Sequence, residues 1–417
     1  MQRFGGAAIP MQQILAADKL QGIEYRVGDP ETLANMPLEV PWIPFDDRVV
    51  EFLDAWSKVL LKDKRAKQYP DVVTFAFWIR KANIMTFKKR FVREDDVTHI
   101  GRGMVFHIAP SNVAVNYAYS LVTGLLMGNA NVVRIPSKEF EQIPVLNNAL
   151  QKVFEQGYED ILKRICLIRY GHQKEITQEL SKYADARVIW GGDRTIAEIQ
   201  ECSLPSRAVE IAFADRYSVA IINADDYLNA DQDWKQIARQ FYNDTYLTDQ
   251  NACTSPRMVI WTGSRREEAK KIFWAQLYEI LEKEYSLQDK QVVDKLTNQY
   301  LLSTLGKEYH IIPTVDNYIT RVQIMEPAAD WMNLKGNSGF FFEYDCTTWN
   351  ELLPLCSDTA CQTVSYYGDI VGLKETLLLY GVKGVDRIVP MGSTMDFDLI
   401  WDGYNLYEWL TRSVVWG

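Results

Sequence analysis

Residues 108–133 contain no charged side chain, and this run constrains the fold more than any other part of the chain. A membrane-spanning helix needs about 20 consecutive apolar residues. Here Pro110, Asn112, Gly124 and Gly128 interrupt the apolar sequence and divide it into a strand, a helix and a second strand. We therefore predict a buried βαβ unit and no membrane span.

Strands and helices continue to alternate after this run. We expect strands at residues 104–109, 131–135, 165–169, 187–190 and 208–213, separated by helices at 113–127, 143–154 and 174–183 and a short helix from 193. Further strands are expected at 219–222, 258–261, 318–324, 339–342, 363–366 and 386–389, with helices at 234–246, 265–284, 289–302, 349–356 and 373–380. Such alternation produces right-handed crossovers and parallel pairing. We predict an α/β fold with two α/β domains whose sheets are mostly parallel.

The first domain is expected to end near residue 212. Residues 1–212 contain a lead-in, with helices near 49–60 and 72–85, followed by the first alternating block. Residues 213–395 form the second domain. Residues 396–417 are rich in aromatic side chains, and we expect this C-terminal segment to pack on the functional site or on a subunit interface.

Charge and cysteine pattern exclude several classes of protein. A net charge of −10 argues against a nucleic-acid binder, which usually carries a basic face. The six cysteines are scattered without a Cys-x-x-Cys pair, which indicates free thiols in a reducing compartment. The four histidines lack metal-ligand spacing, and residues 1–20 lack the features of a signal peptide. We expect a cytoplasmic protein without a metal site.

One cysteine, Cys253, lies at a polar junction between an expected helix and an expected strand. Its neighbours are small or polar: Asn251, Ala252, Thr254 and Ser255. A cysteine that serves packing usually lies in an apolar segment, whereas a thiol in a polar loop can meet a substrate. Cys253 is therefore the candidate nucleophile, and a structural loop cysteine is the alternative.

A turn after the first expected strand of the charge-free run could bind a ligand. Pro110, Ser111 and Asn112 stand there, just before an expected helix. The N-terminus of a helix can hold an anion or polarise a carbonyl. Alternatively, Ser111 or Asn112 serves only to cap the helix.

Two further strand ends carry candidate ligand-binding residues. Arg134, Ser137 and Lys138 follow one strand, and two cations at the carboxyl end of a strand would suit a phosphate. The alternative there is an ordinary solvated strand end. Gly191 and Gly192, followed by Asp193, would let a ligand approach the backbone closely, although the chain contains no Gly-x-Gly-x-x-Gly loop.

Glu210 is a single carboxylate among apolar residues of an expected strand. Partial burial raises the pKa of a carboxylate toward the range useful for proton transfer. The alternative is that Glu210 faces water or pairs with Arg207.

Five segments, in this order, resemble the aldehyde dehydrogenase superfamily. They are His-Ile-Ala-Pro-Ser-Asn-Val at 107–113, Gly-Asn-Ala-Asn-Val-Val-Arg at 128–134, Trp-Gly-Gly-Asp at 190–193, Asn-Ala-Cys-Thr-Ser-Pro at 251–256 and Trp-Asp-Gly-Tyr at 401–404. The set looks most similar to the LuxC-type acyl-CoA reductases, or long-chain fatty acyl reductases. It implies an aldehyde dehydrogenase-like fold, with a Rossmann-like NAD(P)-binding domain before a catalytic domain that carries the nucleophile.

The resemblance implies roles for three catalytic residues. Cys253 corresponds to the thiol that accepts the acyl group. Asn112 corresponds to the asparagine that stabilises the oxyanion together with the backbone amide of the nucleophile. Glu210 stands where the superfamily has a general-base glutamate, although Ile211 and Ala212 follow it in place of the family's Leu-Gly.

The resemblance also implies a nicotinamide cofactor, held by Pro110, Ser111, Arg134, Ser137, Lys138, Gly191, Gly192 and Asp193. The superfamily's Lys-Pro-Ser-Glu is replaced by Ile-Pro-Ser-Lys at residues 135–138. Loss of a carboxylate and gain of a cation favour a 2′-phosphate, so NADPH is expected, with NADH as the alternative.

The resemblance thus implies NADPH-dependent reduction of an acyl thioester, on CoA or on a protein, to an aldehyde through an acyl-cysteine intermediate. A partner acyl-protein synthetase and a homo-oligomer are implied by the same resemblance. One alternative is an NAD(P)-dependent aldehyde dehydrogenase that makes acids. Others are a non-catalytic acyl-binding or scaffold subunit, and a thioesterase that consumes no cofactor.

Overall fold

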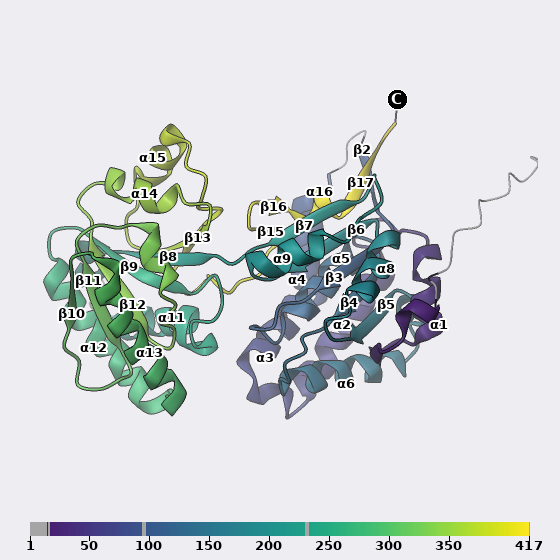
Figure 1. Ribbon diagram of the computed structural model, residues 1–417, viewed down its shortest axis with the longest axis horizontal. Coiled ribbons are helices and arrows are strands. Elements are labelled where there is room, and N and C mark those ends of the chain that lie inside the picture. The colour runs from purple at the N-terminus through teal and green to yellow at the C-terminus, as the bar shows by residue number, and fades with distance from the viewer. Residues whose placement is uncertain (1–14, 16, 94–96, 230–232, 417) are drawn as a thin grey trace, which may run out of the picture. The chain divides into compact units, whose positions relative to one another are not determined.

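The computed structural model describes residues 15, 17–93, 97–229 and 233–416 (Figure 1). Residues 1–14, the start of the expected lead-in, lie outside this description. The chain divides into two compact units: unit 1 comprises Met1–Ala214 and Tyr404–Gly417, and unit 2 comprises Asp215–Gly403. Each unit contains one large sheet, and the predicted α/β fold with mostly parallel sheets is confirmed.

The sheet of unit 1 has the strand order β1-β5-β4-β3-β6-β7. Its strands are β1 (Glu24–Val27), β3 (Met104–Ile108), β4 (Ala130–Arg134), β5 (Ile165–Arg169), β6 (Ala186–Trp190) and β7 (Val209–Phe213). All neighbours pair in parallel except the edge strand β1, which is antiparallel to β5. The chain winds outward from β3 in both directions. The switch point between β3 and β6 is where open α/β sheets bind ligands, outside the carboxyl ends of the strands.

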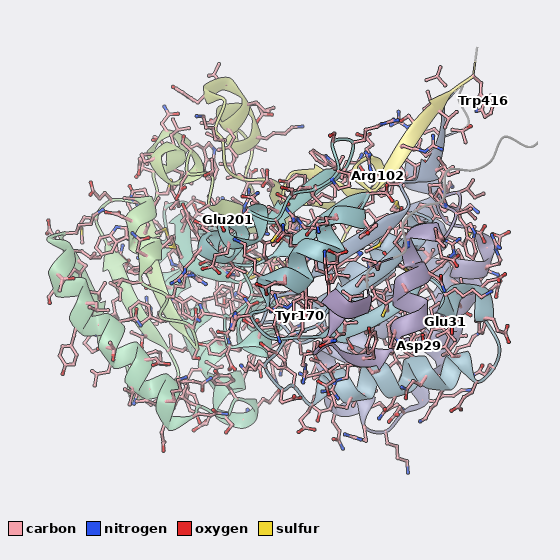
Figure 2. All side chains as sticks on the ribbon, turned by 45° about the vertical axis from the view of Figure 1, so that its right-hand side comes forward. Asp29, Glu31, Arg102, Tyr170, Glu201 and Trp416 are labelled. Atoms are coloured by element: carbon pink, nitrogen blue, oxygen red, sulfur yellow. The ribbon has the colours of Figure 1, made fainter. Side chains whose placement is uncertain are left out.

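Helices cover both faces of this sheet. They are α1 (Pro30–Asn35), α2 (Asp47–Lys62), α3 (Pro70–Trp78), α4 (Lys81–Phe91), α5 (Asn116–Leu126), α6 (Gln142–Phe154), α7 (Glu159–Leu162), α8 (Lys174–Tyr183) and α9 (Asp193–Gln200). Apolar side chains of α8 and α9 share one core with β3 and β4. Asp29 caps α1 by accepting from the Thr32 amide at 2.7 Å (Figure 2). Among the described helices, none is both long and apolar enough to span a membrane.

The single helix expected over residues 72–85 is wrong. α3 ends at Trp78 and α4 begins at Lys81, because Arg80 adopts an extended conformation between them. Asp54 of α2 accepts a hydrogen bond from the backbone N–H of Lys81 at 3.0 Å. This contact satisfies an amide that a new helix start leaves unpaired, and it depends on a residue far from the break in the sequence.

The C-terminal segment belongs to unit 1 from Tyr404 onward. After α16 (Leu406–Trp409), strand β17 (Thr411–Val415) pairs antiparallel with β2 (Val97–Gly101). The Asn129 side chain ties this segment to the main sheet: it accepts from the amides of Arg102 (2.7 Å) and Gly103 (3.2 Å) and donates to the Leu410 carbonyl (2.9 Å).

The sheet of unit 2 has the order β10-β11-β12-β9-β8-β13-β14 and is parallel except for the edge strand β10. Its strands are β8 (Tyr217–Asn223), β9 (Pro256–Thr262), β10 (Tyr309–Ile312), β11 (Thr320–Ile324), β12 (Phe340–Asp345), β13 (Cys361–Tyr367) and β14 (Arg387–Pro390). Two apolar cores lie on its opposite faces. Two short strands, β15 (Ile400–Trp401) and β16 (Tyr404–Asn405), follow β14 along the chain.

The helices of unit 2 are α10 (Ala224–Asn229), α11 (Trp234–Thr245), α12 (Arg266–Glu284), α13 (Asp289–Leu302), α14 (Leu353–Cys356) and α15 (Leu373–Tyr380). The helix expected over 349–356 is instead a 3-10 turn, Trp349–Leu352, followed by α14. Pro354 is the physical reason, because it has no N–H to continue a helix through this position.

Replacing Asn129 with alanine tests the link between the C-terminal segment and the unit 1 sheet. Asn129→Ala should lower the free energy of unfolding of unit 1 by about 2–4 kcal/mol, because buried backbone groups lose their partner. Urea denaturation measures the loss, and faster hydrogen exchange at Arg102 and Gly103 locates it. The control Asn148→Ala, at an exposed position of α6, should change stability by less than about 0.5 kcal/mol.

Candidate functional site

Cys253 lies at the amino edge of the unit 2 sheet, in the loop between the 3-10 turn Tyr246–Thr248 and β9. It is partly exposed, whereas the other five cysteines of the chain are buried. Ser218, at the start of β8, donates from its hydroxyl to the Cys253 carbonyl at 2.8 Å. Cys253 is therefore more exposed than the other cysteines of the chain.

The side chain of Gln250 holds this loop in place. Its carboxamide oxygen accepts from the amides of Gly339 (2.6 Å) and Phe340 (3.2 Å). Its nitrogen donates to the carbonyls of Pro256 (3.0 Å) and Phe340 (3.4 Å). Gln250 is fully buried, so these bonds form without competition from water and join the Cys253 loop to the start of β12.

Two left-handed turns face each other beside the same loop. Asp249 and Gln250 have φ values of 52° and 55°, and Asn337 and Ser338 have values of 51° and 48°. The Ser338 amide donates to the Asp249 carbonyl at 3.0 Å, and the Tyr285 hydroxyl donates to the Asp249 carboxylate at 2.5 Å. Left-handed non-glycine residues cost free energy and persist where the surroundings over-determine them, often at functional sites.

The surroundings of the Cys253 sulfur favour the protonated thiol. Burial raises the pKa of Cys253 to about 12, and the charge of Asp402 acts in the same direction. A hydrogen bond from Gln362 and the charge of Arg257 oppose the rise. Burial also raises the pKa of Asp402, to about 6. At neutral pH the free protein therefore holds Cys253 as a protonated thiol.

The residues expected to bind ligands after β3 lie at the switch point of unit 1. Ser111 and Asn112 are exposed in a bend that precedes α5. The alternative that one of them is the N-cap of the helix is wrong, because α5 begins at Asn116 with Val115 as its N-cap and no side-chain cap. The bend therefore places both residues at the carboxyl end of the central strand.

The three residues expected after β4 are in different environments. Arg134 is partly buried and donates to the carbonyls of Gly171 (2.8 Å) and Tyr170 (3.4 Å), and its guanidinium lies over the ring of Tyr170, which Figure 2 labels. Ser137 and Lys138 are exposed. Arg134 thus binds the backbone that follows β5, whereas the charged side chain of Lys138 is exposed to solvent.

The glycines after β6 leave room for a ligand. Gly192 is the N-cap of α9, and no atom lies within 4 Å of the position that a Cβ would occupy there. Asp193 begins the helix. The preceding Trp190 stacks on Phe213, with ring centroids 3.8 Å apart. An open backbone at a helix N-terminus beside a parallel sheet is suited to a phosphate.

Glu210 is not the isolated carboxylate that the sequence suggested, and its partner is not Arg207. Arg187 occupies the register position beside it on β6 and donates from Nε at 2.6 Å. Gln200 donates to the other carboxylate oxygen at 2.7 Å. Arg187 is itself fixed by the Ser181 hydroxyl and the Cys202 carbonyl. The Arg187–Glu210 ion pair therefore links β6 to β7.

Asn112, Glu210 and the expected cofactor residues lie in unit 1, whereas Cys253 lies in unit 2. Sequence reasoning missed Gln250 and Gln362, and it named Asp402 only within the Trp-Asp-Gly-Tyr segment, without a role. The signal for Asp402 was the Asp-Gly pair at 402–403, since this dipeptide favours turns with two left-handed residues; the φ values are 49° and 76°. Among the described residues, no group of His, Cys, Asp or Glu side chains is placed to hold a metal ion.

A match to the sequence model of a known family shows to which family the chain belongs. The sequence model of the Acyl-CoA reductase (LuxC) family matches residues 85–306, which is more than half of the chain. The chain belongs to the LuxC family. The resemblance seen in the sequence is therefore confirmed.

Named relatives agree with this membership. The long-chain acyl-protein thioester reductase of Vibrio harveyi is 23% identical over 307 residues, which cover 70% of this chain and 59% of the relative. The reductase of the same name from Aliivibrio fischeri is 25% identical over 322 residues, covering 75% and 64%. The chain thus spans less than two thirds of the length of the curated relatives it matches.

Solved structures show the same fold. A mutant of the 1-pyrroline-5-carboxylate dehydrogenase of Thermus thermophilus has a TM-score of 0.63 at 13% identity, covering 93% of this chain and 85% of that one. Aldehyde dehydrogenase 21 of Physcomitrella patens has a TM-score of 0.63 at 12% identity, covering 92% and 88%. The expected aldehyde dehydrogenase-like fold is confirmed.

Replacing Gln250 with leucine tests the clamp on the Cys253 loop. Gln250→Leu should lower the free energy of unfolding of unit 2 by about 2–4 kcal/mol, because buried amides lose their acceptor. Urea denaturation gives the change, and hydrogen exchange at Gly339 should accelerate. Gln299→Leu, on α13 of the same unit, is the matched control and should stay within about 0.5 kcal/mol. Equal stability of the two variants would refute a clamping role.

Proposed function

We propose that this chain reduces an acyl thioester to an aldehyde, with a nicotinamide cofactor and an acyl-enzyme intermediate on Cys253. The observation that carries the proposal is a partly exposed thiol in an over-determined loop of a LuxC-family chain. In this proposal unit 2 supplies the nucleophile and unit 1 binds the cofactor.

The first chemical step is acyl transfer to Cys253. The sulfur attacks the thioester carbonyl carbon, a new C–S bond forms, and the original thiol leaves with a proton. Because the pKa of Cys253 is about 12 in the free protein, the thiol must lose its proton as the bond forms. The cofactor, when bound, supplies a hydride for the acyl carbonyl. Release of the aldehyde then returns Cys253 to its free state.

Asn112 and Glu210 have supporting roles in the proposal. The Asn112 carboxamide and the Cys253 backbone amide would donate to the carbonyl oxygen as it becomes negative. Loss of one such donor typically costs about 100- to 1000-fold in rate. Glu210 would assist proton transfer or limit hydrolysis, and its pairing with Arg187 and Gln200 means that it acts from a fixed position.

The residues of unit 1 fit a dinucleotide. The sheet has a switch point between β3 and β6, and the space at Gly192 is open. In the proposal Pro110, Ser111, Gly191, Gly192 and Asp193 lie along the backbone of the cofactor, and Arg134, Ser137 and Lys138 lie at its adenosine end. We assign NADPH because Lys138 is an exposed cation at the position where a carboxylate would select against a 2′-phosphate.

The substrate that we propose for this chain follows from the names of its relatives. Both are called long-chain acyl-protein thioester reductases, so the proposal extends to a long-chain acyl group delivered on a protein, with acyl-CoA as a simpler donor. An acyl-protein synthetase would be the protein partner. The exposed Val415 and Trp416 at the end of β17 are candidates for contact in a homo-oligomer.

The central test uses the chemical identity of the product. Long-chain acyl-CoA and NADPH should yield aldehyde and oxidised cofactor, and Cys253→Ser should abolish both aldehyde formation and covalent labelling by radioactive thioester. Mass spectrometry of the released product and of the labelled peptide provides the measurement. Cys202→Ala, which removes a buried thiol, is the control and should retain labelling. Aldehyde formed by Cys253→Ser would end the proposal, and acid released without cofactor use would favour a thioesterase.

Lys138 should govern the choice between the two cofactors. Lys138→Ala should reduce the ratio of kcat/KM for NADPH to that for NADH about three- to tenfold, because an exposed ion pair is worth roughly 1 kcal/mol. Steady-state kinetics with both cofactors measure the ratio. Lys64→Ala removes another exposed lysine of unit 1 and should leave it unchanged. An unchanged ratio in Lys138→Ala would remove the assignment of NADPH through this residue.

A further inference from the structure

Helix α13 turns a lysine into the protein and several apolar side chains toward the solvent. Lys295 is 1% exposed, and Leu302 is the other buried residue of this helix. Val293, Leu296 and Tyr300 share one face of the helix and are 59%, 46% and 70% exposed. An amphipathic helix of a globular protein normally buries its apolar face. The orientation of α13 therefore favours the contacts of Lys295 over burial of these apolar side chains.

The amino group of Lys295 is held by two neutral partners. Its Nζ donates to the carbonyl of Ser338 at 3.0 Å and to the carbonyl of Asn317. Burial lowers the pKa of Lys295 to about 8, and the charge of Asp316 acts in the opposite direction. Burial of an ammonium group costs free energy. An apolar side chain would therefore be the more favourable residue if this position served packing alone.

Lys295 and Gln250 hold the two ends of one peptide group. The carbonyl of the Ser338–Gly339 peptide accepts from Lys295, and the N–H of the same peptide donates to the side-chain oxygen of Gln250 at 2.6 Å. Ser338 and Gly339 are both left-handed, with φ values of 48° and 92°. Rotation of this peptide plane would break both hydrogen bonds and leave buried backbone groups unpaired, which costs free energy. Lys295 therefore fixes the peptide from the end opposite to Gln250.

Two further hydrogen bonds connect the same turn to the loop that carries Cys253. The Ser338 amide donates to the Asp249 carbonyl at 3.0 Å. The side-chain nitrogen of Asn337 donates to the side-chain oxygen of Asn251, also at 3.0 Å, and Asn251 precedes Cys253 by two residues. A continuous path of hydrogen bonds thus runs from α13 through this turn to the loop of the candidate nucleophile.

We propose that Lys295 is a positioning residue for Cys253: it fixes the orientation of the Ser338–Gly339 peptide and so keeps the loop that Gln250 clamps in the geometry from which the sulfur attacks a thioester. This role rests on the proposed function, because the geometry of the loop matters for turnover only if Cys253 is the nucleophile. Small misplacements of a nucleophile greatly reduce the rate of attack. Loss of the lysine contacts should therefore slow acyl transfer even in protein that remains folded.

The rate constant of acyl transfer to Cys253 tests this role separately from folding. The full chain is mixed with radioactive long-chain acyl-CoA without cofactor, and the label on the Cys253 peptide is followed in time. The amplitude of labelling reports the fraction of folded protein, whereas the rate constant at saturating thioester reports the geometry of the site. Lys295→Met should lower this rate constant about tenfold. A lower amplitude with an unchanged rate constant would reduce Lys295 to a structural role and overturn the proposal.

Two further variants separate the hydrogen bonds from other effects of substitution. Lys290→Met removes an exposed lysine from the same helix and should leave the amplitude and the rate constant unchanged. Lys295→Arg keeps N–H donors at the buried position and should lower the rate constant less than threefold, so the proposal can be tested even if Lys295→Met folds poorly. A loss in Lys295→Arg as large as the loss in Lys295→Met would overturn the role of the hydrogen bonds.

Hydrogen exchange tests the path through the peptide without any thioester. Lys295→Met should accelerate exchange of the Gly339 amide, because the peptide that carries it has lost its second anchor. Unchanged exchange at Gly339 would overturn this path. If the wild-type protein is labelled and Lys295→Met is labelled with the same rate constant, the positioning role fails and the proposed function stands. If the wild-type protein takes no label, the proposed function fails and the positioning role fails with it.

Discussion

Burial of both faces of the two parallel sheets is the constraint on which the rest of the molecule depends. A parallel sheet covered on both sides offers polar groups a place only at strand ends or in closed networks. Strand β3 shows the second case: His107 is fully buried, and burial lowers its pKa to about 4. Ser120 and Asn131 pair its two ring nitrogens at 2.7 and 3.0 Å. Glu343, inside β12, is a second such case: it is fully buried and accepts from the indoles of Trp261 (2.9 Å) and Trp274 (2.7 Å).

The position of the candidate nucleophile follows from the same constraint. Cys253 stands at the amino edge of its sheet, and the Gln250 carboxamide with two left-handed turns fixes the backbone around it. The proposed acyl transfer would need such precision, because small misplacements of a sulfur relative to a carbonyl carbon greatly reduce rates. The strain stored in the turns is offset by the hydrogen bonds that hold them.

Local sequence patterns predicted most of the elements within one or two residues, because apolar periodicity is a local property. Helices such as α8 and α13 have the expected bounds. The break between α3 and α4 was not predictable, since Asp54 of α2 stabilises it. Pairing of β2 with β17 has no local signal, because the strands lie far apart in the chain. The partner of Glu210 required the register of β6 against β7. Cys253 was found from its polar loop, whereas the hydrogen bond between Gln362 and Asp402 forms only after folding.

The pairing of β17 with β2 has a consequence for synthesis on the ribosome. Unit 1 is discontinuous, and unit 2 occupies the interval between its two parts. Strand β2 therefore emerges from the ribosome long before β17, the strand with which it pairs. The sheet of unit 2 can form while β2 is still unpaired. An unpaired edge strand is open to wrong partners. The β2 edge of the nascent chain is thus open to wrong pairing until β17 has emerged.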